Sequence, residues 1–176
     1  MSGGNYLTPE AQARIDIDRM LELAGWAVQE PDAVNLSAAQ GVAVREFILE
    51  KPHGRVDYLL FVDGQVVGVL EAKPAGTVLV NVEPQRDDYA EGIPADLATP
   101  VEPIPFLYIS TGVETRFKNT IDPDARTRNV FAVHRPETLA AWIADFHALK
   151  LSLRHRLRNL PVLDTTQLWS AQATAI

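Results

Sequence analysis

The segment 56–73 limits what this chain can fold into more than any other part of it. Two apolar stretches, 56–62 and 65–71, lie on either side of the pair Asp63-Gly64. An Asp-Gly pair between two such stretches is typical of a tight β-hairpin turn. The segment therefore predicts two antiparallel strands whose side chains are mostly apolar.

Charged residues stand at the open end of this hairpin. Asp57 is near the start of the first stretch, and Glu71 and Lys73 close the second. Side chains two residues apart on a strand share a face, so Glu71 and Lys73 point the same way. Burying a charge is costly unless the charge is paired or bound to a metal. Charged groups at the end of an otherwise apolar strand therefore mark a candidate site.

The register of the hairpin decides whether Asp57 joins the other two residues. A two-residue turn at Asp63-Gly64 pairs Asp57 with Leu70 and places Glu71 on the opposite face. A three-residue loop, with Gly64 in a left-handed bulge, pairs Asp57 with Glu71 instead. We predict the second register, or a bulge with the same effect.

Two neighbouring carboxylates and a lysine suit metal-assisted hydrolysis. Two carboxylates side by side repel each other, and a hard divalent cation relieves the repulsion. Mg²⁺ is typically held by one or two carboxylates together with water and substrate phosphate oxygens. A bound metal acidifies a water molecule and stabilises charge on the phosphate. Asp57 and Glu71 are therefore candidate metal ligands, and Lys73 is placed to orient the attacking water.

The segment 8–25 predicts a helix before the hairpin. Thr8 is suited to the N-cap, a proline follows it, and Gly25 suits the helix end. Apolar residues at helical spacing form the expected buried stripe: Ala13, Ile17, Met20, Leu21 and Ala24. Glu10 precedes Ala13 by three residues, so we expect it on the buried side. There it would be a further metal ligand or would hold a metal-bound water.

The remaining pattern predicts an α/β fold with a central mixed sheet flanked by helices. The other expected elements are strands at 41–50 and 106–110, weaker strands at 114–117 and 129–133, and helices at 84–92 and 136–150. The segment 151–161 is basic and predicts a linker or an extra helix. No internal repeat is apparent.

Length and charge set further bounds. A chain of 176 residues suits one domain with a sizeable core. It has no cysteine, which excludes disulfides and thiolate metal sites.

The net charge is −7, with 7 Lys/Arg and 17 Asp/Glu in residues 1–113 but 9 Lys/Arg and 6 Asp/Glu in residues 114–176. We expect the acidic part to carry the metal site and the basic part to lie along a phosphate backbone, with weak DNA binding by the chain alone. The sequence shows no signal peptide or membrane span, which fits a cytoplasmic location.

These motifs, taken in order, resemble the N-terminal nuclease domain of the restriction (R) subunit of type I restriction-modification enzymes, within the PD-(D/E)XK nuclease superfamily. The resemblance covers about residues 8–150. The residues that carry it are Glu10, Arg14, Ile15-Asp16, Leu23-Ala24-Gly25-Trp26, Asp57-Tyr58, Glu71-Ala72-Lys73, Gln85, Tyr89, Tyr108-Ile-Ser-Thr-Gly and Pro136–Leu139. In two places the chain departs from the family pattern. Val56 stands where a proline is usual, and Thr111-Gly112 where Asn-Gly is common.

The resemblance implies a restriction-endonuclease-like fold and a type I site-specific deoxyribonuclease that cuts double-stranded DNA with Mg²⁺, for which Mn²⁺ can substitute. It implies that the Ala72 carbonyl joins Asp57 and Glu71 at the metal, with Glu10 assisting. Gln85 and Tyr89 would lie on one helix face beside the active site and support cleavage. The implied partners are DNA and the modification and specificity subunits, with no membrane.

The tail 168–176 resembles the segment before the phosphate-binding loop of superfamily 2 helicase and translocase motors. The chain has no Gly-Lys-Thr or Gly-Lys-Ser, so ATP binding would belong to a motor domain outside it. We therefore expect a nuclease domain at 1–150, with 151–176 as a linker and the start of the motor. Two other readings stay open. One is a stand-alone repair nuclease of the same fold, and the other is a non-catalytic scaffold that docks partner subunits or DNA.

Overall fold

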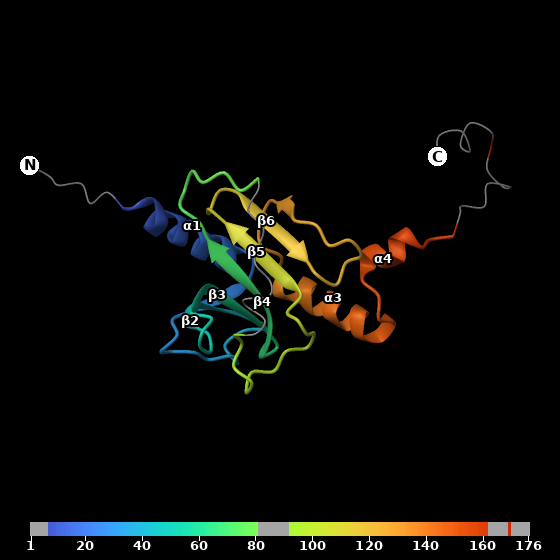
Figure 1. Ribbon diagram of the computed structural model, residues 1–176, viewed down its shortest axis with the longest axis horizontal. Coiled ribbons are helices and arrows are strands. Elements are labelled where there is room, and N and C mark those ends of the chain that lie inside the picture. The colour runs from blue at the N-terminus through green and yellow to red at the C-terminus, as the bar shows by residue number, and fades with distance from the viewer. Residues whose placement is uncertain (1–6, 81–91, 162–168, 170–176) are drawn as a thin grey trace, which may run out of the picture.

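The computed structural model describes residues 7–80, 92–161 and 169 of the chain (Figure 1). Within these residues the elements follow in the order α1 (Pro9–Leu23), β1 (Trp26–Gln29), β2 (Gly41–Ile48), β3 (Arg55–Val62), β4 (Gln65–Ala72), β5 (Phe106–Ser110), β6 (Thr115–Asn119), β7 (Arg128–Val130), α3 (Pro136–Leu149) and α4 (Leu153–Arg158).

The strands of the described residues form one seven-stranded sheet in which spatial order equals chain order. The pairs β1–β2 and β4–β5 are parallel, and the other neighbouring strands are antiparallel. The predicted α/β fold, a central mixed sheet flanked by helices, is confirmed. The parallel β4–β5 pair brings the ends of both strands to one edge of the sheet, where Ala72 pairs with Ser110.

Helix α1 forms where the sequence predicts it. The Thr8 hydroxyl accepts a hydrogen bond from the Ala11 amide at 3.2 Å, and a proline occupies the first turn. Ala13, Ile17 and Leu21 are fully buried, as the periodicity predicts. Ile17 and Leu21 pack, with residues of α3, on one face of the sheet.

The sheet separates two apolar clusters. We call the cluster under α1 and α3 the helix-side core; it includes Tyr58, Leu70 and Tyr108. The cluster on the other face, here called the loop-side core, includes Leu59 and Val69. Within the described residues, its outer cover comes from side chains of connecting segments: Leu36, Ile93 and Leu97. The inner strands β3, β4 and β5 are therefore buried on both faces, which explains their nearly continuous apolar sequences.

Differences from the predicted elements lie mostly at the edges. Strand β1 was not predicted because four residues carry too little pattern; its Trp26 is buried, and the indole donates to the His134 carbonyl at 3.0 Å. Strands β6 and β7 are displaced by a few residues from the expected ranges. Of the two predictions for the basic segment 151–161, the extra helix is confirmed at residues 153–158. The expected helix at 84–92 lies almost wholly outside the described residues.

No helix within the described ranges is long and apolar enough to cross a membrane.

Candidate active site

A β-bulge in the hairpin brings Asp57 opposite Glu71. The turn is the two-residue kind, with Asp63 and Gly64 both at positive φ, 50° and 76°. Beyond it, Phe61 pairs with Val66 but Leu60 pairs with Gly68, so one residue of β4 is left over. The register then pairs Tyr58 with Leu70, and one further step places Asp57 opposite Glu71. The predicted bulge with the same effect is confirmed, and the three-residue loop is not used.

Strands β2 and β3 both change face next to Asp57. Val56 belongs to the loop-side core and Tyr58 to the helix-side core, although residues two apart on a regular strand share a face. On β2, Arg45 bonds to α1 whereas Phe47 packs against the loop-side core. Glu46 between them has a φ of 50°. The irregular backbone lets the Asp57 carboxylate sit at the end of β3, between the two cores.

Both oxygens of the Asp57 carboxylate are engaged. Its Oδ2 accepts from the Ala72 amide at 2.9 Å, and its Oδ1 accepts from Arg14 Nη2 at 3.0 Å. The Asp57 side chain is 24% exposed to solvent. A carboxylate in this position is fixed in orientation and still open to solvent.

Glu71 and Lys73 lie beside it on the end of β4. Their side chains are 25% and 31% exposed and form an ion pair with each other. The Lys73 amide donates to the Ser110 carbonyl at 2.8 Å, which ties this end of the chain to β5. The prediction that Glu71 and Lys73 share a face is confirmed by the ion pair. The predicted triad of Asp57, Glu71 and Lys73 therefore gathers at adjoining strand ends.

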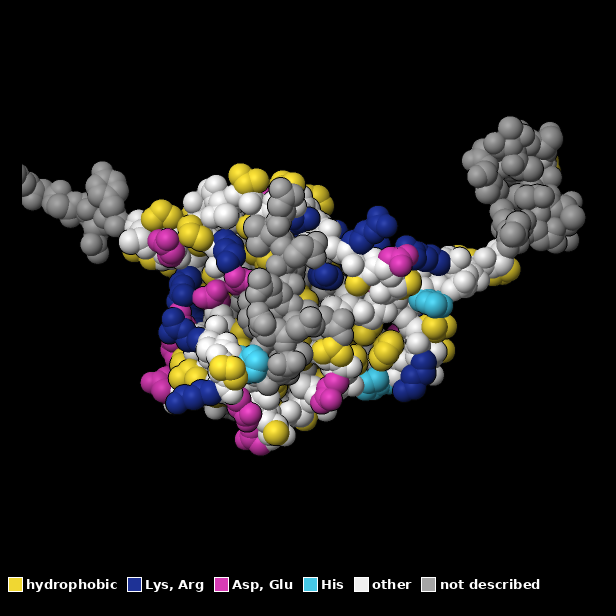
Figure 2. Space-filling view, viewed as in Figure 1, with side chains coloured by type: hydrophobic (Ala, Val, Ile, Leu, Met, Phe, Trp, Pro, Cys, Tyr) yellow, Lys and Arg dark blue, Asp and Glu magenta, His cyan; other side chains and the backbone are white. Residues whose placement is uncertain are grey.

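Arg14 on α1 connects this site to β2. One of its nitrogens bonds Glu46 and another bonds Asp57, and Glu46 also pairs with Arg55. Partial burial by itself would lower the pKa of Arg14, but the hydrogen bond and charge of Glu46, with the charge of Asp57, raise it above its ordinary value. Figure 2 shows acidic and basic side chains interleaved over this part of the molecule, at the left of the view.

Glu10 is exposed, so the expectation that it sits on the buried side is wrong. The first turn of α1 lies beside residues 72–75 at the end of β4, and burial along the helix begins only at Ala13. Glu10 still lines a small pocket beside the site, with Arg14, Ala72, Lys73 and Pro74. The pocket places Glu10 near Ala72 and Lys73, but Asp57 and Glu71 do not line it.

The oxygen atoms gathered at this site are of the kind that binds a hard divalent cation. Two carboxylates, Asp57 and Glu71, adjoin the backbone of Ala72, and oxygen donors of this kind are what Mg²⁺ prefers. Within the described residues, no three acidic or histidine side chains converge as a metal-binding group. Two carboxylates are nevertheless within the usual protein contribution to a Mg²⁺ site, because water and phosphate supply the rest.

Two residues predicted for the site lie outside the described residues, and two residues that were not predicted belong to its surroundings. Gln85 and Tyr89 lie outside the described residues, as does most of the tail 168–176. Arg14 and Glu46 were not predicted to contact the site. Arg14 follows Glu10 by one helical turn, a spacing that places it on the same helix face. No sequence pattern pointed to Glu46, because its place beside Arg14 depends on its left-handed backbone conformation.

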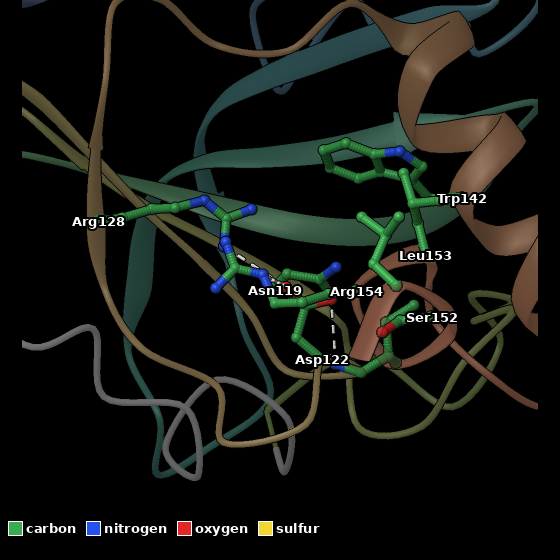
Figure 3. Close-up of a pocket in the computed structure, with 9 residues that line it drawn as sticks. Asn119, Asp122, Arg128, Trp142, Ser152, Leu153 and Arg154 are labelled. Carbon is green, nitrogen blue, oxygen red and sulfur yellow. Dashed lines mark hydrogen bonds and ion pairs between the residues drawn. The ribbon is translucent and has the colours of Figure 1, made fainter. Parts of the chain in front are cut away.

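A separate hollow of about 200 Å³ lies between α3, α4 and the connection after β6 (Figure 3). Trp142 and Leu153 form part of its wall, and the Asp122 carboxylate, only 7% exposed, pairs with Arg128 at 3.4 Å and Arg154 at 3.6 Å. Two further arginines of α4 pair with aspartates of α3 and of the β6–β7 connection. The basic charges of α4 thus help to hold this helix on the domain.

Residues 31–126 match the family described as type I restriction enzyme R protein N terminus (HSDR_N). The chain belongs to this family. The matched residues include Asp57, Glu71 and Lys73, whereas Glu10 and Arg14 precede them. The suspected kinship with the R subunit's N-terminal domain is therefore confirmed.

A solved structure has a similar fold. It is a fragment described as the HsdR subunit of a type I restriction enzyme from Vibrio vulnificus YJ016, with a TM-score of 0.53 and 19% sequence identity. The likeness covers 78% of this chain and 25% of that one, so the chain spans about a quarter of the protein it matches. No curated protein matches the chain.

Proposed function

We propose that this domain is a Mg²⁺-dependent endonuclease that hydrolyses phosphodiester bonds of double-stranded DNA. The observation that carries the proposal is the gathering of Asp57, Glu71 and Lys73 at the adjoining ends of β3 and β4. Two carboxylates and an ammonium group held this way suit metal-assisted hydrolysis better than they suit a solvated surface.

The carboxylates would hold the cation with help from the Ala72 carbonyl. When bound, Mg²⁺ would lower the pKa of a coordinated water and neutralise charge on the phosphate. The Ala72 amide fixes the Asp57 carboxylate through Oδ2, so its orientation is set before substrate arrives. Glu10, at the rim of the adjacent pocket, is placed to hold a water molecule near the site.

Lys73 would orient the attacking water and favour its deprotonated form. Its ammonium group already lies against Glu71, so it needs no long movement to reach a water held by that carboxylate. The Lys73 backbone amide donates a hydrogen bond to the Ser110 carbonyl, and this bond limits the positions that the Lys73 side chain can reach. Gln85 and Tyr89 would support cleavage.

Membership in the R protein family supports a role for this reaction in a restriction system. In the full R subunit, the nuclease would work beside an ATP-driven translocase and with modification and specificity subunits, and would cut DNA away from the recognition site. ATP would be bound by that motor and not by this chain, because the chain holds no phosphate-binding loop sequence. The cytoplasm, where the DNA lies, is the expected location.

Calorimetric titration of Mg²⁺ or Mn²⁺ into the protein tests the proposal, first alone and then with a short duplex. We compare wild type with Asp57→Asn, Glu71→Gln and the matched control Asp63→Asn, an acid at the other end of the same hairpin. We expect saturable binding that the first two substitutions abolish and the third leaves unchanged, with the same circular dichroism for all. No Asp57-dependent binding under either condition would refute the metal site.

The alternative is a non-catalytic scaffold that docks partner subunits or DNA. The observation that favours it is that the carboxylates of Asp57 and Glu71 already face cations, Arg14 and Lys73 respectively. The same titration separates the two functions, because a scaffold has no reason to bind a divalent ion through these side chains. A stand-alone repair nuclease would give the same metal binding, but would cleave DNA without other subunits.

A further inference from the structure

Within the described residues, the ion-paired carboxylates beside the candidate site are matched by an equal number of cations. Ion pairs connect the three acids Glu46, Asp57 and Glu71 with three cations: Arg14, Arg55 and Lys73. A divalent cation added to this set meets no excess negative charge within it. Positive charges near a metal position weaken its binding unless another anion enters with it.

Among the described residues, Arg14 contacts a candidate ligand from another element of the fold. It comes from α1, whereas Asp57 comes from β3, and its Nη2 lies 3.0 Å from Asp57 Oδ1. The other oxygen of that carboxylate already accepts from the Ala72 amide. A metal that binds Asp57 through Oδ1 must therefore compete with Arg14 for that oxygen or share it.

Glu46 gives Arg14 a second acceptor. It bonds a different nitrogen of the same guanidinium, and its own position is held by Arg55 and by the unusual backbone of β2. A guanidinium that gives up Asp57 would thus still be paired. This arrangement makes the Arg14–Asp57 contact separable without leaving a half-buried charge alone.

We propose that Arg14 regulates metal binding as a charge latch. It holds the Asp57 carboxylate while the site is without a metal and so keeps the affinity for divalent ions low. When a substrate phosphate brings negative charge to the site, Arg14 releases Asp57 and stays paired with Glu46. The inference rests on the proposed function and adds regulation to it. Metal binding and DNA binding at this site are then coupled, each strengthening the other by the same factor.

The expected effect follows from Coulomb's law. One positive charge about 5 Å from a divalent cation, at an effective dielectric constant close to that of water, changes the dissociation constant about tenfold. We therefore expect Arg14→Gln to tighten Mn²⁺ binding about tenfold in the absence of DNA. Glu46→Gln should weaken Mn²⁺ binding, because it leaves Asp57 as the remaining acceptor of Arg14.

The experiment is calorimetric titration of Mn²⁺ into the 176-residue protein, with and without a short duplex. The variants are Arg14→Gln, Glu46→Gln and their combination. Arg19→Gln is the matched control, since Arg19 is an exposed arginine on the same helix and lines a hollow away from the site. In the combined variant the Glu46 effect should vanish, because it acts through Arg14. The duplex should improve metal affinity less in Arg14→Gln than in wild type.

Three results would overturn the latch. If Asp57-dependent binding is present but Arg14→Gln weakens it, Arg14 only orients the carboxylate. If Arg14→Gln lowers thermal stability and leaves metal affinity unchanged, its role is structural. In both cases the proposed function survives. If neither wild type nor Arg14→Gln binds Mn²⁺ through Asp57, with or without duplex, the latch falls together with the proposed function.

Discussion

The Asp57 carboxylate accepts a hydrogen bond from the Ala72 amide at 2.9 Å and thereby joins the ends of β3 and β4. A side chain bonded to the backbone of the neighbouring strand has little freedom to rotate. The candidate site is thus built on two central strands of the sheet, where both backbones are held by buried neighbours. Sites supported by strands are held more accurately than sites on loops.

Lys73→Ala should separate metal binding from cleavage. The ammonium group is expected to act on the water and not on the metal, so the substitution should leave Mn²⁺ affinity equal to or tighter than wild type. Cleavage should fall by about 100-fold, the scale of a single acid–base or water-orienting group. Plasmid nicking measures the loss of cleavage, and calorimetry measures the Mn²⁺ affinity. Loss of metal binding in Lys73→Ala would contradict the assigned role.

Gly68→Ala should disturb the bulge that sets the register. A Cβ at this position would lie 2.1 Å from the Phe106 carbonyl oxygen, so β4 and β5 would have to move apart. We expect a loss of about 2–3 kcal/mol in the free energy of unfolding, as for other overpacked interiors. Chemical denaturation measures it. Gly64→Asn is the control, since its turn position is open and Asn tolerates positive φ; a loss as large there would show that the effect is not specific.

The Tyr58 hydroxyl should stabilise the attachment of α1 to the sheet. It donates to Asp18 Oδ1 at 2.8 Å, and Arg45 pairs with the same carboxylate at 2.7 Å. Burial, followed by the hydrogen bond and charge of Asp18, raises the pKa of Tyr58 well above its usual value, so it stays a donor. We expect Tyr58→Phe to cost about 1–2 kcal/mol. In a cycle with Asp18→Asn, additive effects would show that the two groups do not interact.

His134 should make stability depend on pH between about 4 and 6.5. Its ring lies among Phe117, Trp142 and Tyr108, and its Nδ1 is 2.7 Å from the Tyr108 hydroxyl. Burial, with a smaller contribution from the charge of Arg128, lowers the pKa of His134 to about 4. The unfolded chain, with a pKa near 6.5, therefore binds the proton first, and stability is lost as pH falls through this window.

We expect the His134 contribution to that loss to be about 1–2 kcal/mol, reduced from the full shift because the ring is partly open to solvent. Thermal or chemical unfolding of wild type and His134→Gln at pH 4.5 and pH 7 measures it. The variant should lose less stability on acidification than wild type, although carboxylates contribute equally to both. Equal losses would mean that His134 is not held neutral by the fold.

Part of the site was accessible from the sequence. The Asp-Gly turn and the apolar stretches predicted the hairpin, and the two-residue spacing placed Glu71 and Lys73 together. These features are local: turn chemistry and strand alternation depend on residues close in the chain. The order of motifs was also enough to suggest the family that the comparison then showed.

The tertiary structure decided what depends on distant contacts. A bulge in β4 decides whether Asp57 faces Glu71, and it lies beside Gly68, where β4 approaches the Phe106 backbone closely. Glu10 was misplaced because helical periodicity says which side of α1 is apolar but not where the sheet beneath it ends. Arg14 bonds Asp57 across 43 residues of chain and Glu46 across 32, beside a face change in β2 and β3 that no alternation pattern reveals. The sequence by itself thus determined the local elements and the chemistry available, and the packing of α1 and β2 against the hairpin decided which charges meet.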